Sequence, residues 1–170
     1  VALSVAELDE HGALTPDRLG ELRQRYKAGK DALIRHFEAS RPTAPAATRL
    51  IRGIARHTDV TVLHLWELCG MPAEAALLAV GGYGRGELFP HSDVDVLVLL
   101  PSGLCGTGSP QSEAKRSVES FITACWDIGL EIGSSVRTVD DCIGEARKDV
   151  TVQTALLESR FLCGSRRLFT

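Results

Sequence analysis

The sequence predicts an α+β fold with α/β character, in which helices flank a small mixed sheet. Two observations point to it. Two long segments with apolar residues at helical spacing come first, and short runs rich in valine, leucine and isoleucine then alternate with further helical segments. We therefore expect an N-terminal helical segment, residues 1–72, followed by a core that contains the sheet, residues 73–170.

The N-terminal segment is predicted to form two helices. Thr15 is suited to cap the first, and Pro16 suits its first turn, where the proline's missing N–H is not needed. The prolines of the stretch RPTAPAA cannot continue this helix. A second helix is expected from about residue 46 to residue 68, with Gly70 ending it. Both segments carry apolar side chains along one face, as expected for helices that pack on a core.

Three strands are expected in the core. They are separated by glycine-rich stretches or helices, and the third is expected to bend at its glycine, Gly133. The segment PSGLCGTGSPQS, which follows the second strand, reads as a flexible loop. The strands are predicted at residues 75–80, 93–100 and 130–138.

Three helices are expected between and after these strands. The first covers residues 112–128 and is expected to turn Trp126 inward together with its other apolar residues. Asp140 is expected to cap a second, short helix. Thr151 is expected to cap a third helix, which ends at Gly164.

Composition and charge exclude several classes of function. The 170 residues carry 19 basic and 22 acidic side chains, a net charge of −3, so no general surface for nucleic acid is expected. The five cysteines form no CxxC pair, and an odd number does not suit a disulfide framework. No signal peptide and no apolar run of membrane-spanning length is visible. We expect a cytoplasmic protein without nucleic-acid or membrane partners and, because it begins with Val1, a piece of a longer chain.

The stretch GGYGRGELFPHSDVDVLVLL, residues 81–100, contains an acidic pair at the start of a strand. Residues two apart in a strand point to the same face, so Asp93 and Asp95 present two carboxylates together. Two like charges repel, which drives each carboxyl toward its protonated form. A divalent cation removes this penalty, and oxygen ligands without histidine or thiolate favour Mg²⁺ or Mn²⁺ over zinc. The opposite face is filled by Val94, Val96 and Val98.

Residues before the acidic pair are suited to bind phosphate. The glycines Gly81 and Gly82 allow a ligand to approach the backbone, and Arg85 and Ser92 add hydrogen-bond donors. The sequence contains no Gly-Lys-Ser/Thr, which excludes a Walker P-loop, and the glycine spacing does not fit the dinucleotide-binding motif. A phosphate cradle beside a two-carboxylate metal site indicates metal-assisted handling of a nucleoside triphosphate.

Two further acidic residues are candidates for a third metal ligand. Glu131 lies in the third predicted strand, between two apolar residues. Asp127 ends the preceding helix, in the segment CWDIGL. Glu131 could instead be an ordinary exposed strand residue, and Asp127 could instead make a hydrogen bond at the end of its helix. The sequence does not decide between the two candidates.

The motif GGYGRGELxPxSDxDxL resembles the nucleotidyltransferase domain of the bacterial bifunctional uridylyltransferase/uridylyl-removing enzymes, in the DNA polymerase β-like superfamily. The resemblance continues through CWDIGLEIGSSVRTVDDC and DVTVQTALLESRFLCG and covers roughly residues 76–169. It implies the small mixed sheet of that superfamily. It also implies that Gly81 and Gly82 hold the triphosphate of UTP and that Asp93 and Asp95 bind catalytic Mg²⁺.

The resemblance further implies a reaction and a partner. UTP would donate UMP to a tyrosine hydroxyl of the nitrogen-regulatory protein PII and release pyrophosphate. The superfamily commonly has a serine after the glycines, whereas this chain has Tyr83, so Ser92 or backbone N–H groups would supply that phosphate contact.

Other functions remain open from the sequence alone. The resembled enzymes carry an HD phosphohydrolase domain and ACT domains, but the five histidines here are isolated, so no uridylyl-removing activity is expected in these residues. Nothing in the sequence identifies a pocket that reads the base, so an adenylyl- or guanylyltransferase with another target is an alternative. A non-catalytic domain that binds nucleotide or serves as a scaffold is the alternative from another class.

Overall fold

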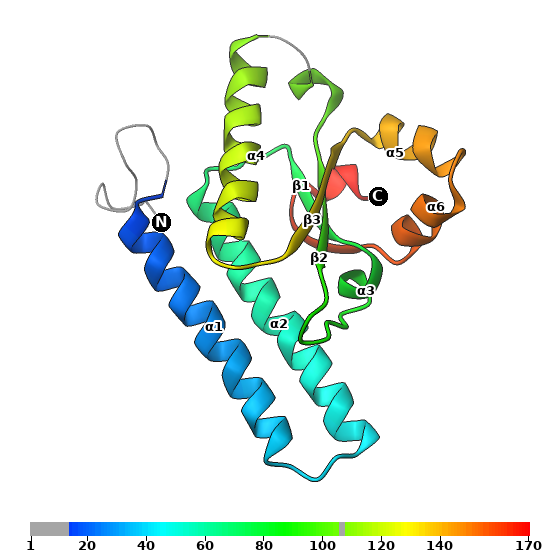
Figure 1. Ribbon diagram of the computed structural model, residues 1–170. Helices are drawn as coiled ribbons and strands as arrows, with labels where there is room; N and C mark the ends of the chain where they lie inside the picture. The colour runs from blue at the N-terminus through cyan, green and yellow to red at the C-terminus, as the bar shows by residue number, and fades with distance from the viewer. Residues whose placement is uncertain (1–13, 106–107) are drawn as a thin grey trace.

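A four-stranded mixed sheet forms the centre of the computed structural model, which describes residues 14–105 and 108–170 (Figure 1). The strand order is β3-β2-β1-β4. Strand β1 pairs antiparallel with both β2 and β4, whereas β2 and β3 are parallel. This mixed sheet with flanking helices confirms the predicted fold class. The strands are β1 (Ala76–Ala79), β2 (Val94–Leu99), β3 (Ile132–Arg137) and β4 (Arg160–Gly164).

Helices cover both faces of the sheet. Helices α2 and α4 pack on one face, and α5 and α6 lie on the other, while α1 runs alongside α2 (Figure 1). The α-helices are α1 (Pro16–Glu38), α2 (Ala44–Leu68), α3 (Gly81–Gly84), α4 (Ser109–Asp127), α5 (Val139–Ala146) and α6 (Val150–Leu157). Short 3₁₀ turns cover Ser102–Leu104 and Arg166–Leu168. No helix in the described ranges is long and apolar enough to cross a membrane.

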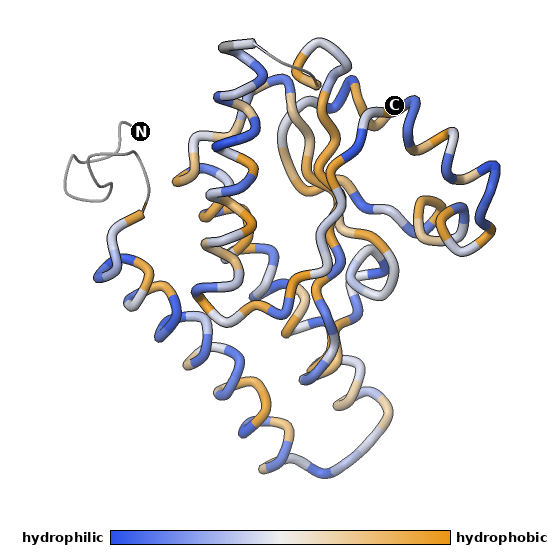
Figure 2. Tube along the Cα trace, turned by 45° about the horizontal axis from the view of Figure 1, so that its top comes forward, coloured by the Kyte–Doolittle hydropathy of each residue, from blue (hydrophilic) through white to orange (hydrophobic). Residues whose placement is uncertain are grey.

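Alternation along β2 sends successive side chains into two apolar clusters. Val94, Val96 and Val98 join the larger cluster, with α2 and α4, as their spacing predicts. Leu97 and Leu99 join the smaller one, beneath α5 and α6. The hydropathy colouring shows the result, since the centre of the molecule is mostly orange and α1 alternates between orange and blue (Figure 2). The larger cluster spans both predicted segments, and their division at residue 72 remains a proposal.

The two N-terminal helices form where the sequence predicts them. The Thr15 side chain accepts a hydrogen bond from the Arg18 N–H at 3.4 Å and caps α1. Helix α2 begins slightly earlier than predicted, because Thr43 caps it and its proline fits the first turn. The rings of Tyr26 and His57 stack across the pair with centroids 5.3 Å apart, which holds α1 against α2.

Both predicted caps in the C-terminal part are wrong, in each case by two residues. Thr138 caps α5 instead of Asp140, through a reciprocal capping box with the Asp141 side chain. Asp149 caps α6 instead of Thr151, whose N–H donates to the Asp149 carboxylate at 2.8 Å. Several neighbouring residues of capping type compete at both places, and the one whose backbone leaves the strand or turn in extended conformation becomes the cap.

The last predicted helix ends early, and a strand replaces its second half. Helix α6 stops at Leu157, and residues 160–164 pair with β1 as β4. Pairing with the sheet satisfies the backbone of this apolar segment, which local periodicity cannot reveal. The prediction that Trp126 turns inward is also wrong, because its side chain is 55% exposed while Phe121 and Cys125 are fully buried. The cysteines are free thiols, as expected.

Two glycine substitutions test how closely α3 is packed. A β carbon at Gly84 would collide with the backbone carbonyl oxygen of Glu158 and lie 3.0 Å from that of Ala79. We expect Gly84→Ala to lower the free energy of unfolding by about 1–3 kcal/mol, since neither carbonyl can move freely. Gly20→Ala is the matched control, because nothing lies near that position in α1 and the change should stabilise the helix by about 0.5–1 kcal/mol. Urea denaturation of both variants measures the difference, and a neutral Gly84→Ala would contradict this packing.

Candidate active site

A glycine turn brings the end of β1 next to the start of β2. The Val80 N–H donates to the Asp95 carbonyl at 3.0 Å, so the chain leaves β1 beside the second aspartate. Gly81 then adopts a φ of +57°, which glycine reaches without strain, and the short helix α3 follows. A β carbon at Gly81 would lie 3.6 Å from Oδ2 of Asp95. The first glycine and the acidic pair, far apart in the motif, therefore lie side by side.

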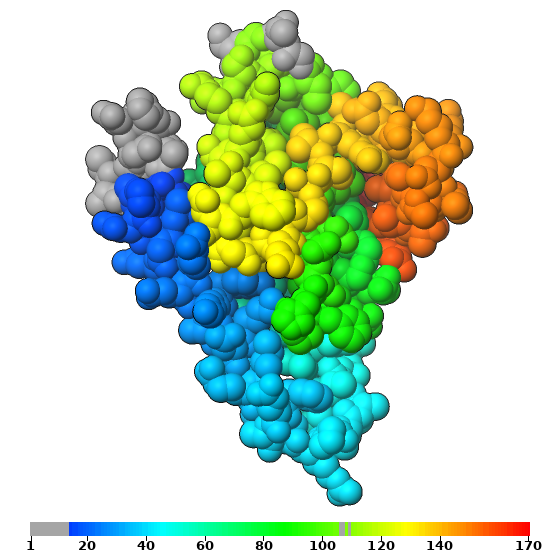
Figure 3. Space-filling model, in the orientation of Figure 1, coloured from blue at the N-terminus to red at the C-terminus, as the bar shows by residue number. Residues whose placement is uncertain are grey.

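The return to β2 forms one wall of a cleft of about 390 Å³. The loop is anchored by Leu88, which is buried and whose N–H donates to the Ile51 carbonyl of α2 at 3.2 Å. In the space-filling view, the green segment after α3 lies at the surface, beneath the yellow residues of α4 and β3 (Figure 3). Of the six predicted site residues other than the third ligand, five line the cleft: Gly82, Arg85, Ser92, Asp93 and Asp95.

The two aspartates repel each other, as the sequence predicts. Val94, between them, is buried, whereas both carboxylates reach solvent on the cleft side. The side chain of Asp95 is exposed but crowded on one side by Gly81 and Gly133. This partial burial raises the pKa of Asp95, and the negative charge of Asp93 adds to the rise. A cation between the carboxylates would relieve this repulsion, and such an all-oxygen donor set fits Mg²⁺ or Mn²⁺.

Gly133 on β3 makes room for the Asp95 carboxylate. The parallel register of β2 and β3 pairs Asp95 with Gly133, and a β carbon there would collide with Oδ1 of Asp95. The ladder runs regularly through Gly133 without a bulge, and the bend expected at this glycine remains a prediction. Sequence reasoning missed this role, although a glycine inside a strand is a known signal for a close approach by another group.

The structure does not bring Asp127 into the cleft. Its backbone carbonyl accepts a hydrogen bond from Arg23 Nε at 2.6 Å, and it lines a separate hollow with Leu19, Cys69 and Arg116. Glu131 lies nearer the pair, because its carbonyl accepts from the Val94 N–H at 2.8 Å.

The charge of Glu131 also acts on Tyr26 of α1. Burial raises the pKa of Tyr26 in α1, and the negative charge of Glu131 adds to that rise. No group of three or more histidine, cysteine or acidic residues in the described parts of the chain is placed to hold a metal ion. The cleft therefore offers the carboxylates of Asp93 and Asp95, besides that of Glu87, which lies beside Arg85, and a third ligand from Glu131 remains a prediction.

Arg85 lies at the edge of the cleft in contact with two carboxylates. Its Nη1 donates to Glu158 Oε2 at 2.6 Å, and its Nε lies 3.5 Å from Glu87 Oε2. The Arg85 side chain is 48% exposed, so these ion pairs are screened by solvent. A phosphate in the cleft would compete with Glu158 and Glu87 for this guanidinium.

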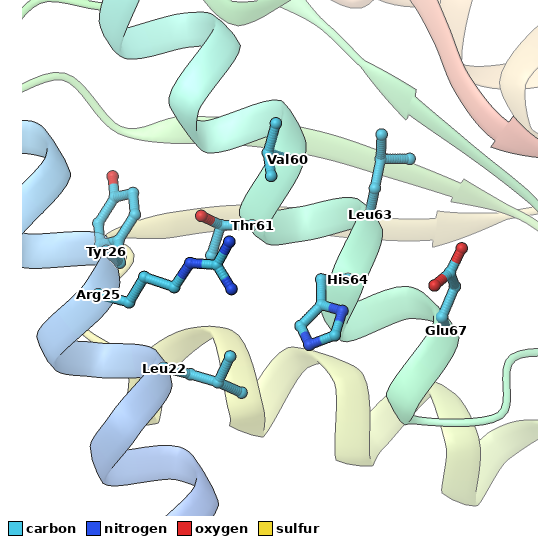
Figure 4. A pocket seen from close by; sticks show the side chains of 8 residues that line it. All are labelled: Leu22, Arg25, Tyr26, Val60, Thr61, Leu63, His64 and Glu67. Carbon is cyan, nitrogen blue, oxygen red and sulfur yellow. The ribbon is translucent and has the colours of Figure 1, made fainter. Parts of the chain in front are cut away.

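A second hollow, of about 310 Å³, lies between α1 and α2 (Figure 4). Arg25 extends from α1 toward Thr61 and His64 of α2, and Leu22 closes one side. Glu67 is its single acidic lining residue, and its walls are mostly apolar. The paired carboxylates and the glycine turn lie elsewhere, so we place the candidate active site in the cleft of Asp93 and Asp95.

The raised pKa of Asp95 predicts how its removal changes stability. The folded state holds the proton of the Asp95 carboxyl more tightly than the unfolded state does, so this proton adds to the free energy of unfolding. Its contribution is complete below pH 3.8 and is lost as the pH rises through the raised pKa of the folded state. Without divalent cations, we expect Asp95→Asn to raise the melting temperature by a few degrees at neutral pH, and this gain should shrink in acid. Thermal denaturation in EDTA across this pH range measures it, with Asp140→Asn on the exposed face of α5 as control. A lower melting temperature for Asp95→Asn at neutral pH would contradict the repulsion.

Comparisons with known proteins find similarity to nucleotidyltransferases. A family model described as "Nucleotidyltransferase domain" matches residues 64–140, which include the glycine turn, both aspartates and β3. The chain is 49% identical over 157 residues to the "Bifunctional uridylyltransferase/uridylyl-removing enzyme" of Cupriavidus metallidurans, covering 91% of this chain and 17% of that protein. The protein of the same name from Cupriavidus pinatubonensis is 51% identical over the same shares. That of Burkholderia thailandensis is 52% identical over 147 residues, 86% of this chain and 16% of the relative.

The chain thus spans about a sixth of the length of these curated relatives. The region of similarity contains the whole cleft, and it extends beyond the family match on both sides. The chain therefore carries a nucleotidyltransferase domain and is similar, over most of its length, to bifunctional uridylyltransferase/uridylyl-removing enzymes.

Proposed function

We propose that this chain is a metal-dependent nucleotidyltransferase that transfers UMP from UTP to a tyrosine of PII. The observation that carries the proposal is the single cleft in which the glycine turn and the carboxylate pair meet. The names of the relatives support uridylyl transfer among the possible nucleotides. PII as the acceptor rests on the sequence resemblance alone.

Asp93 and Asp95 are the residues that would hold the divalent cation. Their carboxylates open to the same cleft, and Gly133 leaves the space that Asp95 needs to keep its position. A bound Mg²⁺ supplies charge neutralisation for the phosphates and lowers the pKa of an attacking hydroxyl. The protein's own contribution is to hold two oxygen ligands in place at the start of β2, a strand that is buried from Val96 to Leu99, so that little reorganisation is needed.

The triphosphate would lie along the glycine turn. Gly81 and Gly82 present backbone without side chains, and the Ser92 hydroxyl and Arg85 guanidinium are donors that line the same cleft as the pair. Tyr83 does not serve as a phosphate ligand in this proposal, because its side chain is buried behind the turn. Arg85 would exchange its contacts with Glu158 and Glu87 for phosphate oxygens.

The reaction forms one bond and breaks one bond. The tyrosine oxygen of the acceptor attacks the α-phosphorus of UTP, and the bond from that phosphorus to the pyrophosphate oxygen breaks. The hydroxyl proton is released, and the products are the tyrosine–UMP ester and pyrophosphate. The open, solvent-facing cleft suits an acceptor that is itself a protein side chain, since a tyrosine on a folded partner can reach only an accessible site.

Nucleotide titration tests this proposal most directly. We expect UTP to bind in the presence of Mg²⁺, more tightly than ATP or GTP, and binding to fall sharply in EDTA. Isothermal titration calorimetry measures each case. Preference for ATP or GTP would favour an adenylyl- or guanylyltransferase, whereas a folded protein that binds no nucleotide would indicate a scaffold.

Removal of either carboxylate should abolish transfer. We expect Asp93→Asn and Asp95→Asn to lower the rate of UMP transfer to PII by at least roughly a hundredfold, because loss even of an outer-shell partner of a metal ligand costs about 10–100-fold. Transfer of radiolabelled UMP measures the rate, with Asp140→Asn as control. Full activity in either variant would exclude the metal site proposed for this pair.

Substitution of Gly133 tests the geometry of the metal site without an activity assay. A β carbon at this position would push the Asp95 carboxylate out of place, so we expect Gly133→Ala to weaken Mn²⁺ binding by roughly 10–100-fold. Electron paramagnetic resonance titration of free Mn²⁺ measures the affinity. Gly144→Ala on α5 is the matched control, because nothing lies near its β carbon. Equal Mn²⁺ affinity in the two variants would show that Asp95 does not depend on Gly133.

A further inference from the structure

One arginine outside the cleft ties three elements together. Arg160 is the first residue of β4, and its Nη1 and Nη2 donate to both carboxylate oxygens of Asp59 on α2, at 2.9 and 3.0 Å. Its Nη2 also donates to the Tyr83 carbonyl at 3.2 Å, and its Nε donates to the Gly84 carbonyl at 3.3 Å. Its guanidinium carbon lies 5.4 Å from the centre of the Tyr83 ring. A single side chain thus connects α2 and β4 to the C-terminal end of α3.

These contacts require a guanidinium. The fork of Arg160 bonds Asp59 through two nitrogens and reaches two backbone carbonyls at the same time, which one ammonium group cannot reproduce. The side chains of Arg160 and Asp59 are 35% and 20% exposed, so the pair is less screened than the other ion pairs of the surface. The hydrogen bond with Asp59 raises the pKa of Arg160 further above its ordinary value, so the guanidinium stays charged.

The segment that carries Arg160 is also packed directly against the glycine turn. A β carbon at Gly84 would collide with the carbonyl of Glu158, and the Glu158 side chain holds Arg85. Tyr83, between these contacts, is 1% exposed. The turn is therefore supported from behind by residues 158–160, while its other side borders the cleft.

We propose that Arg160, held by Asp59, is a positioning residue for the nucleotide: it fixes the glycine turn from behind so that the turn is ready to receive the triphosphate. This inference rests on the proposed function, in which Gly81 and Gly82 contact the phosphates. Arg160 is not among the residues that line the cleft and acts through the backbone of Tyr83 and Gly84. Residue 160 also lies beyond the region matched by the family model.

Steady-state kinetics of Arg160 variants test the inference. We expect Arg160→Met to raise the KM for UTP roughly tenfold to a hundredfold, because a misplaced binding element can cost about that much. The kcat at saturating UTP should stay close to that of the wild type, since the turn's contacts act equally in the ground and transition states. The KM of Arg160→Lys for UTP should lie between those of the wild type and Arg160→Met. Asp59→Asn should also raise KM, and the double variant should be less impaired than the product of the single effects predicts.

Stability must be separated from positioning. Val118→Ala removes part of a buried side chain from α4, away from the cleft, and serves as a control that lowers the melting temperature without touching the turn. If Val118→Ala raised the KM as much as Arg160→Met at a matched loss of melting temperature, the positioning role would be overturned.

Hydrogen exchange gives a second reading that does not depend on nucleotide. In Arg160→Met we expect faster exchange of the amides that close the turn, those of Arg85, Gly86 and Glu87, while the amides of β1 and β2 stay protected. Unchanged exchange in the turn would overturn the inference. If the wild type bound no UTP, the proposed function would fail on its own, and the exchange rates would still decide whether Arg160 holds the turn.

Discussion

The strand β2 must be buried on both faces and yet carry two charges at one end. Four of its residues from Val96 onward fill the two apolar clusters, and this burial sets its direction and register. At the other end the covering layers stop, so Asp93 and Asp95 open to solvent. The rest of the architecture follows from this division. Helices on both faces bury the apolar part of the strand, and the glycine turn closes around its charged end.

The charged end depends on small residues in the neighbouring elements. Gly81 on one side and Gly133 on the other leave space for the Asp95 carboxylate, which any larger residue at 133 would displace. The raised pKa of Asp95 shows that the folded protein, without a cation, disfavours the ionised form of this carboxyl. Stability is given up locally so that a cation can be bound, a trade-off common at functional sites.

The local parts of the site could be predicted from sequence, and the long-range parts could not. Spacing by two places Asp93 and Asp95 on one face, and the turn follows from its glycines, because both depend only on neighbours in the chain. The roles of Gly133 and Arg160 depend on which strands become neighbours. The strand β4 forms only because β1 offers it a partner, and its residues otherwise continue the pattern of α6. Asp127 and Glu131 looked equally suited as the third metal ligand. The apolar spacing of α4 predicts the helix but not the direction in which its last residue points.

The contact between Asp59 and Arg160 joins residues separated by 101 positions. During synthesis the ribosome releases the α1–α2 pair, the glycine turn and both aspartates long before it releases β4. At about 5–20 residues per second, the turn and the unpaired edge of β1 wait several seconds for their last partner. The nascent chain therefore passes through a stage in which the charged pair already exists and the segment behind it does not. Translation order makes the completion of the sheet edge and the completion of the nucleotide site a single, late event.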